Sequence, residues 1–332
     1  MKLQKLQLEE IKRLVHGVAR VEEVDGAIAL YRFTKEQHEL YKSVSEDFYR
    51  KSLSTAGVSF EFDTDSEHLR FAVAVGKGSS RYFFTHSVFV DGERIGELSG
   101  EIERGAEDVP FSKAFQLGTG MKRVRIVFPW SVSSKLIALE VDDKAEILLV
   151  EKTRKMLMFG DSITQGYDAM QPENAYAVQI ATRFQAEAID KGIGGERFRP
   201  MLASLKDDME PDLITVAYGT NDWSKSTKEE FEMSCKGFYT NLSNTYPDVK
   251  IYAMAPVWRT SINDKKQIGE PLSFVVQYLN KVAEEIPNMT VIDCIDFIPH
   301  ELENFQTDGL HPIDKGFEHY VNNLWSAITV EK

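Results

Sequence analysis

Residues 156–166 have the sequence MLMFGDSITQG, a short apolar run that ends in a turn containing glycine and serine. Similar apolar runs recur further along the chain, as LITVAYG at 213–219, IYAMAP at 251–256 and TVID at 290–293. Unbroken runs of this length are typical of parallel strands that are buried on both faces. Helical patterns separate them, at residues 174–185, 228–246, 271–286 and 314–328. We therefore expect residues 151–332 to form a three-layer α/β/α domain around a parallel sheet.

The sequence before residue 151 has a different period. Large apolar residues recur at every second position in three stretches, Val58 to Phe62, Phe71 to Val75 and Val124 to Phe128. Alternation of this kind indicates half-buried strands, and Asp91-Gly92 between two apolar stretches predicts a tight hairpin. Long helical patterns are absent. Residues 21–150 are therefore predicted to be a β-sandwich of the jelly-roll type, preceded by a short amphipathic helix within residues 1–20.

Composition narrows the classes of partner. The 332 residues exceed what one hydrophobic core usually serves, which agrees with two domains. Lys and Arg number 39 against 52 Asp and Glu, so the net charge of −13 disfavours nucleic acid and anionic membranes as partners. No window approaches eighteen consecutive apolar residues, and the amino terminus lacks the apolar core of a signal peptide. With two cysteines only, the sequence predicts a cytoplasmic protein.

Ser162 is the first candidate catalytic residue. It lies where an expected strand turns into an expected helix, so its hydroxyl can face solvent while its backbone N–H faces a developing oxyanion. The alternative role is a helix cap. A serine hydroxyl needs a histidine to accept its proton and a third group to orient that histidine.

The segment Asp308-Gly309-Leu310-His311-Pro312 supplies such a pair. A carboxylate three residues before an imidazole on one loop can hold Nδ1–H while Nε2 faces the serine. A simple turn is the alternative. Neither His300 nor His319 has an acid at that spacing, and both are interpreted as surface groups.

Two further loops offer hydrogen-bond donors for a tetrahedral oxygen. Residues 192–196, GIGGE, follow an expected strand and can present the N–H of Gly195. Residues 219–222, GTND, follow the next strand and can present the amide of Asn221. A glycine turn and a helix cap are the alternatives.

Together, the four segments resemble in order and spacing the conserved blocks of the SGNH hydrolases, also called the GDSL esterase/lipase family. The resemblance covers residues 155–328. It implies that Ser162 is the nucleophile and His311 the base, that Asp308 orients His311, and that Gly195 and Asn221 complete the oxyanion hole with the Ser162 N–H. In the second block Asp190-Lys191 stands where the family usually has asparagine, so Gly194 is the alternative donor. Asp161 is expected to brace the loop.

A β-rich domain ahead of the hydrolase is similar to the arrangement in carbohydrate esterase family 2, the acetylxylan esterase type. This similarity implies removal of a small acyl group, acetyl above all, from a carbohydrate or similar polar substrate. Three residues that follow expected strands are candidates for substrate binding or, alternatively, for packing: Trp223, Trp258 and Arg259. The competing functions are a thioesterase or lysophospholipase with the same triad, and a non-catalytic carbohydrate-binding protein.

No cofactor and no metal are expected. Asp308 and His311 have the spacing of a zinc pair, but no HExxH motif or cysteine cluster supplies further ligands. The acidic stretch 63–67, DTDSE, lacks the glycine and the spacing of an EF-hand and is interpreted as a turn. The expected partner is a small-molecule or oligosaccharide ester, and a homo-oligomer is compatible with the sequence.

Overall fold

The computed structural model describes residues 2–329, and the chain divides into two compact units. The N-terminal unit comprises Met1–Thr153 with Gln171–Glu173, and the C-terminal unit comprises Arg154–Met170 with Asn174–Lys332. Residues 2–20 lie in the N-terminal unit. Within residues 2–329, no helix combines the length and the apolar character that a bilayer crossing needs.

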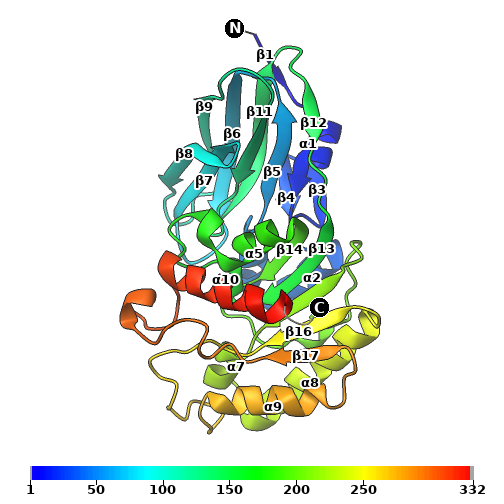
Figure 1. Cartoon of the computed structure of the whole chain (residues 1–332), viewed down its shortest axis with the longest axis vertical. Coiled ribbons are helices and arrows are strands. Elements are labelled where there is room, and N and C mark those ends of the chain that lie inside the picture. Colours follow the sequence, from blue (N-terminus) through cyan, green and yellow to red (C-terminus); the bar gives the residue numbers. More distant parts are fainter. Residues whose placement is uncertain (1, 330–332) are drawn as a thin grey trace. The chain divides into compact units, whose positions relative to one another are not determined.

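Two antiparallel sheets build the N-terminal unit (Figure 1). The first contains, in spatial order, β3 (Arg20–Val24), β4 (Ala27–Tyr31), β11 (Val132–Asp142), β6 (His68–Lys77) and β9 (Val109–Gln116), with β1 (Leu3–Lys5) on β11. The second contains β12 (Ile147–Leu149), β5 (Ser59–Thr64), β10 (Lys122–Val127), β7 (Phe83–Val90) and β8 (Glu93–Glu101), with β2 (Val15–His16) on β5. The predicted β-sandwich is confirmed.

Alternation along the strands produces the core of this sandwich. The apolar residues at every second position of the three alternating stretches are fully buried, from Phe60 and Phe62 on β5 to Val73 on β6 and Ile126 on β10. Their neighbours in sequence point to the other face, as the pleat requires. The hairpin between β7 and β8 turns at Asp91 and Gly92, which have φ angles of 49° and 86°. Both values are left-handed, as in the predicted tight turn.

The expectation that this half lacks helices was wrong for residues 35–52. They form α2 (Lys35–Val44) and α3 (Glu46–Ser52), while the expected amphipathic helix is α1 (Leu8–Leu14). Thr34 caps α2 by accepting the N–H of Gln37, and Ser45 caps α3. Because α2 buries few apolar side chains, Tyr41 among them, its sequence lacks a clear apolar stripe.

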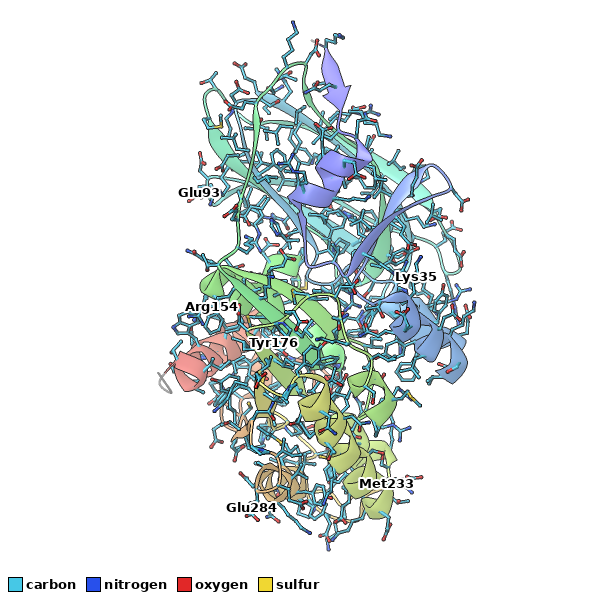
Figure 2. All side chains as sticks on the ribbon, turned by 90° about the vertical axis from the view of Figure 1, so that its right-hand side faces the viewer. Lys35, Glu93, Arg154, Tyr176, Met233 and Glu284 are labelled. Atoms are coloured by element: carbon cyan, nitrogen blue, oxygen red, sulfur yellow. The ribbon has the colours of Figure 1, made fainter. Side chains whose placement is uncertain are left out.

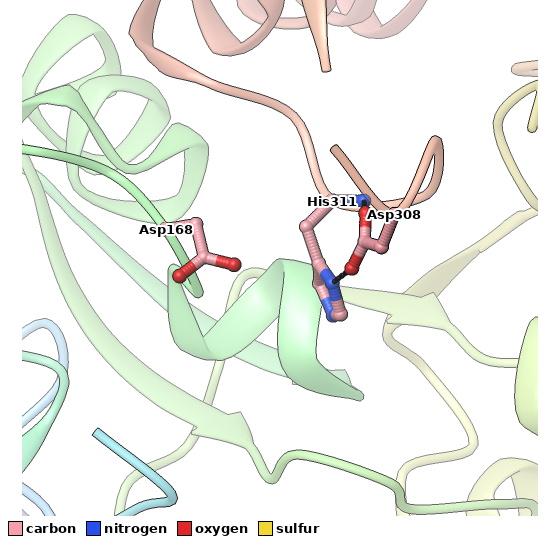
Figure 3. Close-up of side chains that lie close together, drawn as sticks. All are labelled: Asp168, Asp308 and His311. Atoms are coloured by element: carbon pink, nitrogen blue, oxygen red, sulfur yellow. Dashed lines mark hydrogen bonds and ion pairs between the residues drawn. The ribbon is translucent and has the colours of Figure 1, made fainter. Parts of the chain in front are cut away.

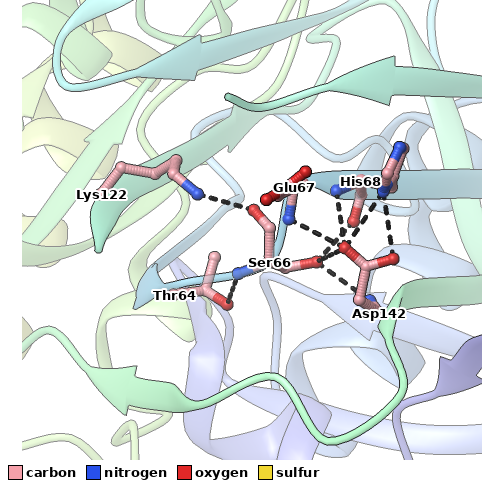
Figure 4. Close-up of polar contacts among 6 residues, drawn as sticks. All are labelled: Thr64, Ser66, Glu67, His68, Lys122 and Asp142. Atoms are coloured by element: carbon pink, nitrogen blue, oxygen red, sulfur yellow. Dashed lines mark hydrogen bonds and ion pairs between the residues drawn. The ribbon is translucent and has the colours of Figure 1, made fainter. Parts of the chain in front are cut away.

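The acidic stretch between β5 and β6 is held by hydrogen bonds within the protein (Figure 4). The carboxylate of Asp142 accepts the backbone N–H groups of Glu67 and His68 at 2.8 and 3.0 Å. Lys122 Nζ donates to the Ser66 carbonyl at 2.7 Å. These contacts account for the conformation of the turn, in agreement with its interpretation as a turn.

The C-terminal unit contains a five-stranded parallel sheet with helices around it, as the sequence predicts. The strand order is β14 (Ala186–Gly192), β13 (Arg154–Gly160), β15 (Leu213–Ala217), β16 (Lys250–Met254) and β17 (Met289–Ile292). The helices are α4 (Ser162–Gln165), α5 (Tyr176–Phe184), α6 (Pro200–Ala203), α7 (Thr220–Lys225), α8 (Lys228–Thr245), α9 (Ser273–Ala283) and α10 (Asp314–Thr329), with a 3-10 turn at Leu302–Asn304. A second 3-10 turn, Pro172–Asn174, includes two residues of the N-terminal unit. Helix α5 packs with α10, and α8 packs with α6 and α9. In Figure 2 the labels Tyr176 and Met233 mark α5 and α8, one helix of each group.

Buried polar contacts fasten the loops that leave this sheet. Lys191 and Asp207 form an ion pair whose side chains are 0% and 1% exposed. Asp222 Oδ1 accepts the backbone N–H of Phe198 at 3.1 Å, while its Oδ2 is buried with no hydrogen-bond partner among residues 2–329. Burial therefore raises the pKa of Asp222 to about 7.

We expect Asp222→Asn to make the protein relatively more stable at pH 8 than at pH 5. The pKa of Asp222 in the folded state lies above its value of about 3.9 in the unfolded state. Protonation of Asp222 therefore favours the folded state, and this contribution is complete at pH values below about 3.9. The stabilisation from the Asp222 proton is lost as the pH rises through about 7. The variant has no carboxyl group at this position, so its stability does not change with pH for this reason. The free energy of unfolding of the variant, relative to wild type, should increase by on the order of 2 kcal/mol from pH 5 to pH 8.

Urea denaturation of both proteins at the two pH values measures this change. The exposed residue Asp248 provides the control substitution Asp248→Asn. Equal pH dependence in Asp222→Asn and wild type would contradict the assignment.

Candidate active site

Three side chains from two distant segments of the C-terminal unit form a hydrogen-bonded chain. Ser162 is the first residue of α4, immediately after β13, and its Oγ lies 2.8 Å from His311 Nε2. His311 Nδ1 lies 2.6 Å from Asp308 Oδ2. A carboxylate at Nδ1 keeps the proton on that nitrogen, so Nε2 is left to accept the serine proton. This is the arrangement that activates a serine hydroxyl.

The loop that carries His311 is shaped by Asp308. Its Oδ1 accepts the backbone N–H groups of Leu310 and His311 at 2.9 and 3.0 Å. Burial opposes ionisation of Asp308, but the hydrogen bonds from His311 and the backbone outweigh it and hold the pKa of this carboxyl well below its usual range. Asp308 therefore remains a carboxylate, able to stabilise a positively charged imidazole.

Two backbone N–H groups are free to bind an oxyanion. Among residues 2–329, neither the Ser162 N–H nor the Gly195 N–H has a hydrogen-bond acceptor. The Gly194 N–H donates instead to Gln165 Oε1 at 2.8 Å. Gly195 has φ +90°, and a Cβ at this position would meet nothing within 4 Å. Of the two glycines, Gly195 is thus the one with an available donor.

The amide of Asn221 is oriented by neighbouring acceptors. Its Nδ2 lies 3.1 Å from the Glu196 carbonyl oxygen and 3.4 Å from Asp161 Oδ2. Asp161 also caps α4, because its Oδ1 accepts the N–H of Ile163 at 3.0 Å. Burial raises the pKa of Asp161 to about 6. Asp161 therefore supports Asn221 and the start of α4, whereas the His311 ring bonds to Asp308.

Two residues that the sequence motifs do not single out lie beside His311. The ring of Tyr167 stacks on the imidazole, with centroids 5.7 Å apart and planes 27° from parallel. The same ring packs on Gly194, where a Cβ would lie 2.8 Å from the tyrosine hydroxyl. Tyr167 thus contacts both the base, His311, and the oxyanion loop, residues 192–196, which carries the Gly195 N–H. The one sequence signal is Gly166, whose φ of 98° ends α4 and redirects the chain.

The second of these residues is Asp168. Asp168, Asp308 and His311 each offer an atom within 4.8 Å of the others (Figure 3). They are the one group of three His, Cys, Asp or Glu side chains within residues 2–329 that has metal-ligand proximity. Asp308 and His311 are already hydrogen-bonded to each other, and an ion at this position would compete with that bond. The absence of a metal stays a prediction from the sequence.

The three candidate substrate-binding residues have different environments. Trp223 is 0% exposed and donates from Nε1 to the Glu270 carbonyl at 2.8 Å, so its ring packs under the loop and is not available to a sugar. Trp258 is half-buried and stacks on His300, with ring centroids 5.0 Å apart. Arg259 lies next to the GTND loop and donates to Thr220 Oγ1 at 3.0 Å. Trp223 is therefore a packing residue. Arg259 is a polar residue whose guanidinium lies close to the candidate site.

Solved structures of the same fold include several two-domain enzymes. Salicylyl-acyltransferase SsfX3 from a tetracycline biosynthetic pathway is 20% identical, with a TM-score of 0.82 over 95% of this chain and 94% of that chain. Acetyl xylan esterase Est2A from the rumen bacterium Butyrivibrio proteoclasticus is 16% identical, with a TM-score of 0.69 over 100% and 99%. A family two carbohydrate esterase from Clostridium thermocellum, in complex with cellohexaose, is 16% identical, with a TM-score of 0.64 over 84% and 93%.

No curated protein sequence matches the chain. Residues 158–319 match the GDSL-like Lipase/Acylhydrolase family, and this segment includes Ser162, Asp308 and His311. The C-terminal unit of this chain therefore belongs to the GDSL-like lipase/acylhydrolase family.

Proposed function

We propose that this protein is a serine esterase that removes a small acyl group, acetyl in particular, from a carbohydrate or similar polar alcohol. The reaction proceeds through an acyl-enzyme and uses no cofactor. The observation that carries the proposal is the hydrogen-bonded chain from Ser162 Oγ through the His311 ring to Asp308.

In the first half of the reaction, Ser162 Oγ attacks the ester carbonyl carbon while its proton passes to His311 Nε2. Asp308 stabilises the resulting imidazolium through Nδ1–H. The tetrahedral oxygen accepts hydrogen bonds from the free N–H groups of Ser162 and Gly195. Asn221 Nδ2 adds a third donor when the oxygen replaces Asp161 Oδ2, its more distant acceptor at 3.4 Å. When the intermediate collapses, the C–O bond to the alcohol breaks and His311 returns the proton to the leaving oxygen.

Water then attacks the acyl-enzyme carbonyl carbon. His311 removes the proton from this water as the new C–O bond forms, and the same donors hold the second tetrahedral oxygen. Collapse of this intermediate returns the proton to Ser162 Oγ and releases the carboxylic acid. The enzyme is thereby restored.

Polar surroundings support a small acyl group and a hydroxylated alcohol. The side chains of Asp161, Asn221 and Arg259 lie in the loops around the serine, and the sequence contains no long apolar lid among these motifs. Two structures of similar fold are an acetyl xylan esterase and a carbohydrate esterase in complex with cellohexaose. A thioesterase or lysophospholipase would instead have to bury a long acyl chain.

Ser162→Ala should reduce kcat for p-nitrophenyl acetate by at least about a thousandfold, because no other side chain replaces the nucleophile. His311→Ala should have a comparable effect. Circular dichroism establishes that both variants remain folded, and a fluorophosphonate should label wild type but not Ser162→Ala. Activity near wild type in Ser162→Ala would refute the nucleophile assignment, and an unlabelled wild type would favour the non-catalytic carbohydrate-binding alternative.

Asp308→Asn should lower kcat less than Ser162→Ala, by about ten- to a thousandfold, because the amide no longer stabilises the imidazolium but the nucleophile and the oxyanion donors remain. Steady-state kinetics with p-nitrophenyl acetate measures the loss. Asp296→Asn, at an exposed acid, is the control substitution. If kcat is unchanged in Asp308→Asn, a group other than Asp308 orients His311.

Acetyl esters should be hydrolysed with a higher kcat/KM than octanoyl esters of the same alcohol. A polar site gains little from a longer apolar chain and has to accommodate its volume. Comparing p-nitrophenyl acetate with p-nitrophenyl octanoate, with the octanoate kept below the concentration at which it aggregates, tests this preference. A clear preference for octanoate would support the thioesterase or lysophospholipase alternative.

A further inference from the structure

Arg259 is held in one orientation beside the candidate active site. Its Nε donates to Ser261 Oγ at 3.1 Å, and its Nη1 donates to Thr220 Oγ1 at 3.0 Å. The guanidinium also lies 5.2 Å from the centroid of the buried Trp223 ring. A planar cation fixed by two hydroxyl groups and one aromatic face is pre-organised to bind a ligand at its remaining edge.

The remaining edge of this guanidinium is open. Nη2 donates no hydrogen bond to any residue between 2 and 329, and it is not among the fully buried polar atoms that lack a partner. The side chain as a whole is half-buried. Its N–H groups at this edge therefore keep contact with solvent.

No acid in the described chain serves as the counter-ion of Arg259. No carboxylate of residues 2–329 lies within ion-pair distance of it, although Asp308, Asp161 and Asp264 are close enough to act on its charge. Each of these acids already has a different donor. Asp308 is bonded to His311, Asp161 to the N–H of Ile163, and Asp264 to Lys266.

Burial without a dedicated counter-ion is unfavourable for a guanidinium. Burial lowers the pKa of Arg259 from its ordinary value, which agrees with incomplete compensation. An anion from outside the protein would remove this deficit. One guanidinium can neutralise one negative charge, and the acids around it would repel a second one. A carboxylate, with one negative charge, therefore fits this edge better than a phosphate dianion.

Arg259 also lies between the loops that hold the reacting groups. Thr220, to which Nη1 donates, precedes Asn221 in the GTND loop. Thr260, the next residue along the chain, donates its N–H to the Gly309 carbonyl at 3.1 Å, in the loop of Asp308 and His311. A group bound to Arg259 is thus placed between the GTND loop and the loop of Asp308 and His311.

We infer that Arg259 binds a carboxylate carried by the substrate, so that the preferred substrates are esters with an acidic group, such as acetylated sugar acids. This inference rests on the proposed esterase function and specifies its substrate class. Nη2 of Arg259 supplies N–H donors in the plane of the guanidinium, and a carboxylate can accept them in charge-assisted hydrogen bonds. In a chain with a net charge of −13, such a cation also offsets the general repulsion of an anionic substrate.

The test compares acetylated glucuronic acid with its methyl ester, in which the carboxylate is masked and the ring is unchanged. With the carboxylate on the alcohol side, wild type should hydrolyse the acid with a kcat/KM about ten- to a hundredfold above that of the methyl ester, the range expected for a charge-assisted hydrogen bond. In Arg259→Gln this ratio should fall to about one. Lys236→Gln removes a positive charge from the exposed face of α8 and should keep the wild-type ratio.

A third substrate separates the two positions that the carboxylate can occupy. Succinylated glucose has its carboxylate on the acyl side, whereas acetylated glucuronic acid has it on the alcohol side. An Arg259-dependent preference for either acid over its neutral counterpart supports the inference and assigns the side. Equal rates for acidic and neutral esters in wild type, or an unchanged ratio in Arg259→Gln, would overturn it.

A binding measurement keeps this result independent of turnover. In Ser162→Ala, calorimetric titration should show at least about tenfold tighter binding of one of the two acids than of its neutral counterpart, and Ser162→Ala/Arg259→Gln should lose that difference. Binding with no preference for either acid, or no binding of either acid, would overturn the inference even if the esterase activity is established. Arg259-dependent binding without hydrolysis by wild type would instead refute the proposed function alone.

Discussion

The parallel pairing of β13 with β14 and β15 is the constraint on which the candidate site depends. Its register places Gly160 opposite both Gly192 and Ala217, so the three strands end at the same level. Both glycines are required there, because a Cβ on Gly160 would lie 1.8 Å from Thr164 Oγ1 and one on Gly192 would lie 2.3 Å from the Gln165 backbone nitrogen. Close contact between α4 and the sheet edge therefore brings the serine and the oxyanion loop together.

His311, the base, comes from the C-terminal part of the chain, and other contacts position it at the carboxyl ends of these strands. His311 lies on a loop after β17, and this loop is held locally by Asp308 and at a distance by the hydrogen bond between Thr260 and Gly309. Gly309 has φ +61°, and a Cβ at this position would lie 2.5 Å from Thr260 Cγ2, so a larger residue would separate the two loops. The position of the imidazole thus depends on backbone packing as well as on its carboxylate.

Electrostatics divides the acids around the serine into two kinds. Asp308 accepts several hydrogen bonds and is readily ionised, whereas Asp161 and Asp222 are buried with fewer donors and keep their protons at higher pH. Arg259 lies among acids that have other donors. The hydrogen bonds that each acid accepts therefore decide whether it is ionised, and they leave Arg259 as the positive charge that a substrate can meet. No single sequence motif encodes this property.

Much of the fold followed from local pattern. Alternation predicted the sandwich strands, unbroken apolar runs predicted the parallel sheet, and Asp91-Gly92 predicted its hairpin, because periodicity is imposed by geometry within a few residues. Helices α2 and α3 were not predicted, since their few buried side chains depend on the neighbours they pack against. The spacing of Asp308 and His311 was equally local, and it correctly identified residues that lie within hydrogen-bond distance.

Sequence by itself determined the two classes of architecture, the order of the motifs and the residue types able to activate a serine. Only the tertiary structure decided that Gly195 rather than Gly194 has a free N–H, that Trp223 is buried, that Tyr167 stacks on the imidazole and that Arg259 lacks a counter-ion among residues 2–329. The physical reason is that each of these properties depends on which partners from distant parts of the chain satisfy or cover a group, and such partners are specified by packing rather than by spacing in the sequence.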